Sequence, residues 1–301
     1  MNATQWNSFV LQNHGSFLQS WQWGEFQQAY GRTIIPLAKD NLQALCIVYP
    51  LRFNKTYLFS PYGPVGNITA TTITPLLNDI KNLAKKYHAI HWRYERAGKL
   101  FSGQPVSNIH PQQSWLLPLT NPEQLLAAMK QKWRYNIHLA ERKGVTIHQS
   151  TDLKDLEKIY PLLKNTAQRQ KIKLHPKRYY TTMVNTLNNH NLTLYLAEYQ
   201  NKIIAGNIML GFGDTITYVH GGSDHAYHTV MAPHLLQWQA IVNAQQAGYK
   251  TYDFFGISEQ WPGITRFKQG FGGQLVEYAG TYELPLNKMW YTAYKLAKLF
   301  S

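Results

Sequence analysis

The stretch LTLYLAEYQNKIIAGNIMLGFGDTITYVHGG, residues 192–222, decides the fold. It contains three strand-like runs rich in β-branched and aromatic residues, which predict an antiparallel three-stranded meander. The following segment at 232–248, APHLLQWQAIVNAQQAG, has the composition and spacing of a helix. KTYDFFGIS at 250–258 then predicts a strand that returns to the sheet.

The same order of elements occurs earlier in the chain. Strand-like runs RTIIPLAKD, LQALCIVYP and KTYLFSPYG precede a helical segment, TPLLNDIKNLAKKYH, and a strand, AIHWRYERA. Corresponding strands begin near residues 32 and 192, 42 and 203, 55 and 215, and 89 and 250, so the offset stays near 160 residues. Two helical segments also precede each meander. The sequence therefore predicts an α/β (α+β) chain with two copies of one unit, each a mixed sheet flanked by helices.

The segment between the copies predicts a helix. Asn121 is a good N-cap, Pro122 occupies the first turn, and Gly144 marks the end. We place the domain division near residue 148. The first domain is then 1–147 plus about 285–301, and the second is 148–284.

The last segment, LNKMWYTAYKLAKLF, has apolar residues at helical spacing. We expect this helix to pack back on the first domain, and a helix on a membrane surface is the alternative.

Positive charge exceeds negative charge by a wide margin. Thirty Lys and Arg stand against sixteen Asp and Glu, for a formal net charge of +14. Residues 121–180 carry thirteen of these cations but only five acids. Such an excess favours a polyanionic partner: nucleic acid, anionic lipid or phosphorylated metabolites.

Several classes of site lack their sequence signatures. The patterns HExxH, CxxC, GxxxxGK[ST] and GxSxG are absent, and no GxGxxG follows a strand. The histidines in YVHGGSDHAYH are irregularly spaced on a glycine loop, and the single cysteine, Cys46, lies in an apolar run. We therefore expect no metal, no serine triad and a buried thiol. The first residues lack the features of a signal peptide and no long apolar run follows, so we expect a cytoplasmic chain.

Six motifs occur in the order seen in the Fem family of peptidoglycan aminoacyltransferases. They are SFLQSWQWGEFQQAYGR, FSPYGPVGN, KWRYNIHLAERKGV, YVHGGS, MAPHLLQWQAI and RFKQGFGG. The chain resembles this family across nearly its whole length. Only QNK separates Tyr199 from Ile203, where some family members insert a two-helix arm. The chain is therefore similar to the armless branch, which resembles enzymes that add the first residue.

The resemblance implies two tandem GNAT-like domains and transfer of an amino acid from aminoacyl-tRNA to the stem peptide of a peptidoglycan precursor. The acceptor would be UDP-muramoyl pentapeptide or its lipid-linked form. Aminoacyl-tRNA would serve as co-substrate, with no separate cofactor. A monomer and a peripheral contact with the inner membrane surface are further expectations.

Lys268 is the main catalytic candidate. Phe267 and Lys268 match a Phe-Lys pair that the family places near the tRNA acceptor end, where a cation can neutralise phosphate or a developing oxyanion. Arg266 precedes them as a second cation, and the following glycines are expected to let a ligand approach the backbone. The alternative is a solvated lysine beside a glycine turn.

Other candidates follow from the same resemblance. Tyr218 and Arg169 are expected to contact the acceptor diphosphate or sugar, with a packing tyrosine and a surface cation as alternatives. Trp21 and Tyr62 match family positions, although aromatic residues at this spacing are often core residues.

Two acids are weaker candidates. Glu95 ends a strand and would accept a proton or pair with Arg93 or Arg96. Asp253 ends the equivalent strand of the second copy and would orient substrate or cap a turn.

Two other functions stay open. The first is a non-catalytic tRNA-binding or RNA-binding module, since charge alone supplies non-specific affinity. The second is an aminoacyltransferase with an acceptor outside peptidoglycan.

Overall fold

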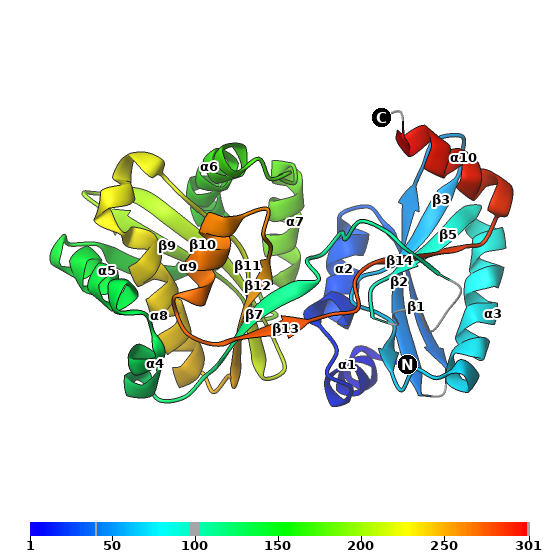
Figure 1. The fold of residues 1–301 in the computed structure, drawn as a ribbon, viewed down its shortest axis with the longest axis horizontal. Helices are drawn as coiled ribbons and strands as arrows, with labels where there is room; N and C mark the ends of the chain where they lie inside the picture. The colour runs from blue at the N-terminus through cyan, green and yellow to red at the C-terminus, as the bar shows by residue number, and fades with distance from the viewer. Residues whose placement is uncertain (40, 97–102, 300–301) are drawn as a thin grey trace. The chain divides into compact units, whose positions relative to one another are not determined.

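The chain forms two compact units in a computed structural model that describes residues 1–39, 41–96 and 103–299. Unit 1 consists of Met1–Gln112 and Tyr278–Ser301, and unit 2 is Gln113–Glu277. Figure 1 shows a mixed sheet with helices on its faces in each unit.

The sheet of unit 1 has the order β1-β2-β3-β5-β14-β6. The first three strands form an antiparallel meander, and β5 returns parallel to β3. The strands are β1 (Thr33–Lys39), β2 (Leu42–Pro50), β3 (Thr56–Ser60), β5 (Ala89–Tyr94), β14 (Tyr282–Pro285), β6 (Gln104–Pro105) and the short β4 (Val65–Gly66), which pairs with β2.

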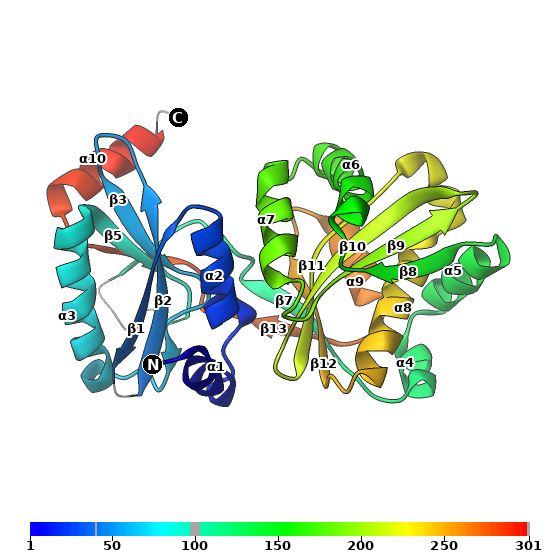
Figure 2. The same cartoon turned by 180° about the vertical axis from the view of Figure 1, so that it is seen from behind.

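Helices lie on both faces of this sheet (Figures 1 and 2). They are α3 (Ala70–Tyr87) on one face, and α1 (Ala3–Gln12), η1 (Phe17–Gln19) and α2 (Trp21–Ala29) on the other. Alternate residues of β2 serve the two faces: Ala44 and Cys46 join the core under α3, whereas Leu45 approaches Gly24 of α2. The thiol of Cys46 is buried, as its apolar surroundings predict. The last helix, α10 (Lys288–Leu299), packs against β5.

The sheet of unit 2 has the order β13-β7-β12-β11-β10-β9-β8. Its central meander is antiparallel, and β12 returns parallel to β11. The strands are β7 (Gln113–Pro118), β8 (Thr146–Ser150), β9 (Leu192–Tyr199), β10 (Lys202–Phe212), β11 (Thr215–Ser223), β12 (Thr251–Ile257) and β13 (Gln274–Glu277).

Both faces of this sheet are also covered. Figure 2 shows α6 (Leu153–Gln170) and α7 (Lys177–Leu187) in front of it. The opposite face carries α4 (Pro122–Ala128), α5 (Gln131–Arg142), α8 (Ala232–Gln246) and α9 (Pro262–Gln269), and the short η3 (His225–Val230) joins β11 to α8. Within the described part of the chain, no helix combines the length and apolar content that a membrane crossing requires.

The predicted repeat is confirmed. The four pairs of corresponding strands begin 159 to 162 residues apart. β9 and β10 are joined directly through Gln200 and Asn201, both with positive φ, so no arm is inserted at this hairpin.

The division between the units lies after residue 112, whereas the sequence placed it near residue 148. The reason is strand pairing: β7 joins the sheet of unit 2 between β12 and β13, and α5 packs on α8. The second boundary also differs from the prediction. The chain re-enters unit 1 at Tyr278, because β14 pairs with β5. The predicted linker helix is also two helices. Asn121 caps α4 as expected, but Met129 and Lys130 have extended backbone and separate it from α5.

Candidate active site in unit 2

An opening between two parallel strands defines the site. β11 and β12 pair at three positions, the last being Thr217 with Asp253, although both strands continue further. On its other edge β11 pairs with β10 along its whole length. β12 likewise pairs with β7, with a register shift around Phe255, whose φ is +58°. Beyond Thr217 and Asp253 the register between β11 and β12 ends, so a ligand can enter between the two strands. We call this place the β11–β12 site.

Lys268 reaches this site from α9. Its side chain is only 7% exposed, and Nζ donates a hydrogen bond of 2.5 Å to the backbone oxygen of Gly256 in β12. Nζ also lies 5.7 Å from the centre of the Tyr218 ring on β11. Among the described residues Gly256 is the one hydrogen-bond acceptor of this ammonium, which has three N–H donors. Two donors therefore remain for an anionic oxygen.

Burial controls the charge of this lysine. It lowers the pKa of Lys268 to about 8, and the nearby charge of Asp253 opposes that shift. The group is still largely an ammonium at pH 7. Lys268 is therefore a buried cation without a direct carboxylate partner within the described chain, an arrangement that reduces stability and is typical of functional sites. This burial excludes the alternative, a solvated lysine beside a turn.

Asp253 organises the β12 side of the site. Its Oδ1 accepts hydrogen bonds from the backbone N of Phe255 at 2.7 Å and from Oγ of Ser114 in β7 at 2.6 Å. Burial raises the pKa of Asp253, and these two hydrogen bonds and the charge of Lys268 oppose that change. Of the two predicted roles, the structure shows the turn cap. The carboxylate fixes the backbone that presents the Gly256 oxygen to Lys268.

Tyr218 lines the β11 side. Burial raises the pKa of its hydroxyl, so the group stays a neutral donor at physiological pH. A Cβ atom at residue 221 would lie 1.9 Å from this hydroxyl, which explains the glycine there. The structure thus brings together Tyr218, Lys268 and Asp253, three residues selected from the sequence.

The three residues of the RFK motif occupy different environments. Phe267 packs against the rings of His234 at 5.2 Å and Phe271 at 5.3 Å, and its backbone oxygen accepts a bond from Trp133. Arg266 is exposed, and residues two apart in a helix point about 200° apart. Lys268 alone reaches the site, Phe267 supports α9 from the core, and Arg266 faces solvent.

The glycines after this motif serve packing within the chain. A Cβ at residue 270 would lie 2.0 Å from the Trp133 ring, and one at residue 273 would lie 2.4 Å from the backbone oxygen of Leu116. Gly273 also has a φ of +96°. These contacts give Gly270 and Gly273 an internal packing role.

Arg169 lies away from Tyr218. It is exposed near the end of α6 and donates to Oγ1 of Thr166 at 3.4 Å. Thr166 in turn accepts from the backbone N of Ser223, at the end of β11. Ser223 is five residues beyond Tyr218, or roughly 16 Å along a strand. The structure does not bring these two predicted acceptor contacts together.

Glu95 belongs to a hydrogen-bond network in unit 1. Its carboxylate accepts bonds from Tyr62 N at 3.0 Å, Thr281 Oγ1 at 3.0 Å, and the backbone N and Nδ1 of His110 at 3.2 and 2.7 Å. Burial would raise the pKa of Glu95, but His110 and these hydrogen bonds hold it below the usual value. A carboxylate with this environment is a weak proton acceptor. Arg93, one expected partner, pairs with Glu283 instead.

Tyr62 and Trp21 also lie in unit 1. Tyr62 is buried and its hydroxyl donates to the backbone oxygen of Pro111 at 2.9 Å. Trp21 begins α2, and its indole donates to Glu25 at 3.1 Å and meets Trp6 edge-on. Both residues have structural contacts in the part of the chain that the structure describes.

Sequence reasoning missed Ser114 and Trp133. Ser114 carried no signal, because its partner Asp253 is 139 residues away. Trp133 lay in the quoted motif KWRYNIHLAERKGV, but nothing local indicated that it supports Gly270 and the backbone of α9.

The chain matches the model of the FemAB family over residues 95–202 and 196–299, which together exceed half of its length. It belongs to the FemAB family. The two matched ranges include all of unit 2, so the β11–β12 site lies within the part that identifies the family.

Individual relatives agree with the FemAB assignment. The aminoacyltransferase FemA of Staphylococcus aureus is 30% identical over 89 residues, which are 28% of this chain and 21% of that protein. The match thus spans about a fifth of the curated relative. The crystal structure of FemX superposes with a TM-score of 0.84 at 17% identity, over 97% of this chain and 98% of the other.

A more distant neighbour identifies the architecture. A tandem GNAT protein from the clavulanic acid biosynthesis pathway has a TM-score of 0.52 at 10% identity, over 82% of this chain and 79% of that one. The FemAB chain therefore consists of two tandem GNAT-like domains, as predicted.

Proposed function

We propose that this chain transfers an amino acid from aminoacyl-tRNA to an amine in the stem peptide of a peptidoglycan precursor. Membership of the FemAB family and the likeness to FemA support the reaction class. The observation that carries the proposal is the Lys268 ammonium, buried in the β11–β12 site with two donors free of partners among the described residues.

This reaction needs a group that stabilises the negative charge on the carbonyl oxygen. It does not need a nucleophilic side chain, because the acceptor amine is the nucleophile. The neutral amine of the acceptor attacks the ester carbonyl carbon, and negative charge develops on the carbonyl oxygen. The new C–N bond forms, the C–O bond to the tRNA ribose breaks, and the amine proton passes to the released ribose oxygen. An ester is already activated, so positioning and an ammonium beside the developing oxyanion supply the rate enhancement.

Each residue of the site has a part in this reaction. Lys268 donates to the oxyanion, and the Tyr218 hydroxyl offers a second donor on the β11 side. Asp253 is a positioning residue, because it fixes the turn that holds the Gly256 oxygen. The activated ester provides the driving force, so we assign no cofactor.

The net charge of +14 fits two anionic substrates. We propose aminoacyl-tRNA as the donor and UDP-muramoyl pentapeptide or its lipid-linked form as the acceptor. The product would supply the interpeptide bridge. We propose a cytoplasmic monomer as the active form, since both substrates face that compartment.

Calorimetry separates this function from a non-catalytic RNA-binding module. The transferase should bind UDP-muramoyl pentapeptide in the absence of tRNA, and should distinguish charged from uncharged tRNA. An RNA-binding module should show no heat with the soluble acceptor and equal affinity for both tRNA forms. The second pattern would contradict the proposal.

The rate should depend on the ionisation of Lys268. Its pKa of about 8 lies below the ordinary 10.5, and the protonated form is the active one. The active fraction is therefore lost as pH rises through about 8, which opposes the rise from deprotonation of the acceptor amine. Single-turnover rates between pH 6 and about 10 should bend near that pKa. The bend should disappear in Lys268→Met, and an identical profile in both proteins would exclude this lysine.

A further inference from the structure

One side of unit 1 is strongly basic. Three segments, 50–56, 80–88 and 288–299, contain eight Lys and Arg and no Asp or Glu. They belong to the loop after β2, the second half of α3, and α10. The neighbouring acid, Asp79, pairs with Lys39 at 3.2 Å. These three segments therefore form a cationic surface, which we call the α3–α10 surface.

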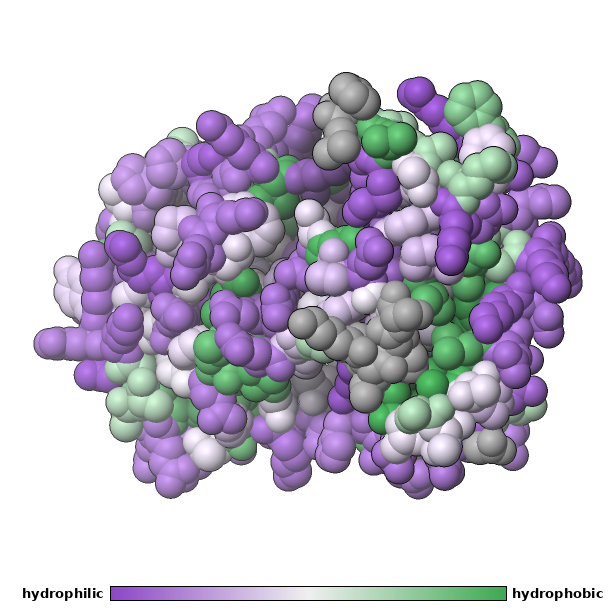
Figure 3. All heavy atoms as spheres, turned by 45° about the vertical axis from the view of Figure 1, so that its right-hand side comes forward, coloured by the Kyte–Doolittle hydropathy of each residue, from purple (hydrophilic) through white to green (hydrophobic). Residues whose placement is uncertain are grey.

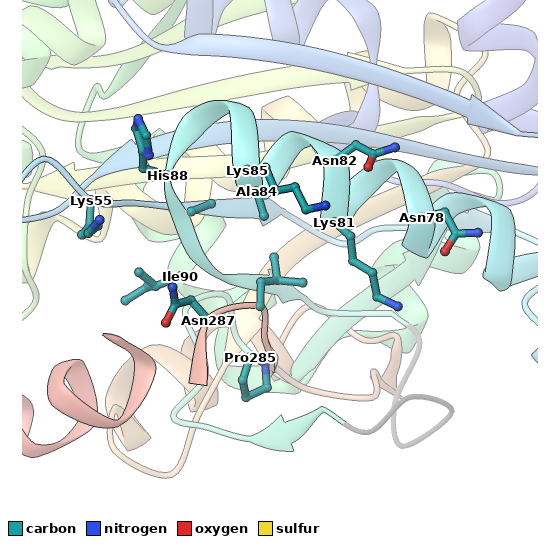
Figure 4. Close-up of a pocket in the computed structure, with 12 residues that line it drawn as sticks. Lys55, Asn78, Lys81, Asn82, Ala84, Lys85, His88, Ile90, Pro285 and Asn287 are labelled. Atoms are coloured by element: carbon teal, nitrogen blue, oxygen red, sulfur yellow. The ribbon is translucent and has the colours of Figure 1, made fainter. Parts of the chain in front are cut away.

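A pocket of about 670 Å³ opens in this surface. The polar residues that line it are Lys55, Asn78, Lys81, Asn82, Lys85, His88 and Asn287. Figure 4 shows Lys81 and Lys85 on α3, with Pro285 and Asn287 on the other side of the pocket. Ammonium and amide donors without a carboxylate in the lining suit a phosphate group.

α10 exposes an apolar face beside the pocket. Met289 and Leu296 are 72% and 52% exposed, and Ala293 between them is exposed as well. These positions recur at helical spacing on one side of α10, whereas Tyr291 and Tyr294 face the ring of His91. A stripe of apolar residues on α10 thus faces solvent, next to the exposed Lys288, Thr292 and Lys298.

The loop after β2 extends the apolar face. Phe53 is 79% exposed and its ring lies 6.2 Å from that of Trp290 on α10. Lys55, which lines the pocket, places Nζ 4.7 Å from the Trp290 ring. The pocket and the apolar face are therefore adjacent. Figure 3 shows green and pale green side chains among purple ones at its upper right.

We infer that the α3–α10 surface docks on a bilayer containing anionic phospholipid. The apolar side chains of Phe53, Met289 and Leu296 enter the headgroup boundary, and the lysines meet the negative surface. The pocket takes the phosphate of one lipid headgroup. This inference stands apart from the proposed transfer reaction, because it concerns binding to lipid alone.

The apolar face favours lipid over RNA. A nucleic-acid surface needs cations and stacking rings, but exposed aliphatic side chains such as Met289 and Leu296 find no partner on a phosphate backbone. Interfacial helices combine lysine, aromatic and aliphatic residues as α10 does.

Vesicle sedimentation with the full chain tests this inference. Binding should be strong to vesicles of phosphatidylglycerol and phosphatidylcholine in equal parts, and weak to phosphatidylcholine alone. The pocket variant Lys81→Gln/Lys85→Gln should bind about 30-fold more weakly, because each lysine near an anionic surface contributes about 1 kcal/mol, which is about fivefold. The apolar variant Met289→Ser/Leu296→Ser should lose at least about 10-fold.

Lys154→Gln/Lys164→Gln provides the matched control, because both lysines are exposed on α6 of unit 2. This variant has the same charge change outside the α3–α10 surface, so it should bind vesicles within about twofold of the wild type. All substituted residues are exposed, so melting temperatures should agree. Equal losses in control and pocket variants, or no dependence on phosphatidylglycerol, would overturn the inference. If the pocket variant lost tRNA binding but kept vesicle binding, the surface would instead be an RNA-binding surface.

Discussion

Replacing Glu283 by alanine should lower the free energy of unfolding of unit 1 by about 3–5 kcal/mol, the cost of breaking a buried ion pair. Glu283 is 1% exposed in β14 and binds the guanidinium of Arg93 through Oε1. Its Oε2 accepts from Tyr291 of α10 at 2.9 Å. The variant leaves a buried arginine without its carboxylate and also loosens α10.

The electrostatics of this cluster give the effect a pH dependence. Burial would raise the pKa of Glu283, but the charge and hydrogen bond of Arg93 and the hydrogen bond from Tyr291 hold it below the usual value. Burial also lowers the pKa of His91 to about 3, so this histidine is neutral at physiological pH. A depressed carboxylate pKa stabilises the fold above the unfolded-state value, and the contribution is lost as pH falls through the folded-state value. The variant should therefore lose part of the acid sensitivity of the wild type.

Thermal melting measures this effect. The transition of unit 1 should fall by about 10 °C or more in Glu283→Ala. Adding Arg93→Met should restore part of the loss, since the unpaired charge is then removed. Glu259→Ala, at an exposed loop position, is the control and should melt like the wild type. If Glu283→Ala melted within about 2 °C of the wild type, the loss of free energy would be below about 1 kcal/mol. That result would refute the ion pair as a major stabiliser.

Replacing Lys268 by methionine should lower turnover by roughly 100-fold or more, the scale of losing one preorganised electrostatic donor. Stability should not fall with it. The wild-type ammonium is buried, and its lowered pKa means that the charge costs folding free energy below pH 8. Methionine removes that cost but leaves the Gly256 oxygen without its donor, a loss of about 1–3 kcal/mol. The melting temperature should therefore be equal to or above that of the wild type.

Lys250→Met makes the same substitution at an exposed position before β12 and should leave turnover near wild type. Affinity for the UDP-linked acceptor alone should survive in Lys268→Met, since its role is on the donor side. Normal turnover in that variant would return Lys268 to a structural role, and a large drop in melting temperature would show that the lysine stabilises unit 2.

The repeat was predictable because each copy is built from local signals. Strand runs of five to eleven residues and helices of fifteen to eighteen residues gave boundaries close to those observed in both meanders. The assignment of β7 to unit 2 and of β14 to unit 1 was not predictable. β7 has six residues and β14 has four, and their pairing partners β12 and β5 lie more than 130 residues away in sequence. No local pattern specifies such pairing.

The candidate site was predictable only in part. Family resemblance selected Lys268 and Tyr218. Arg266 and Lys268 both lie on α9, but the turn of the helix directs only Lys268 toward the site. The burial of Lys268 had no sequence signal, because flanking glycines are usually read as an exposed turn. Here Gly270 is needed for contact with Trp133, a residue 137 positions earlier. Burial and pKa arise from such long-range packing.

Mass spectrometry of the acceptor tests the central claim most directly. The wild-type chain is incubated with a pool of charged tRNA and either UDP-muramoyl pentapeptide or the lipid-linked precursor, beside a FemAB enzyme as positive control. We expect one acceptor to gain the mass of a single amino acid residue, at a rate roughly 100-fold lower with Lys268→Met. The mass gain also identifies the amino acid. No gain with either acceptor, while the control enzyme works, would contradict the proposed function.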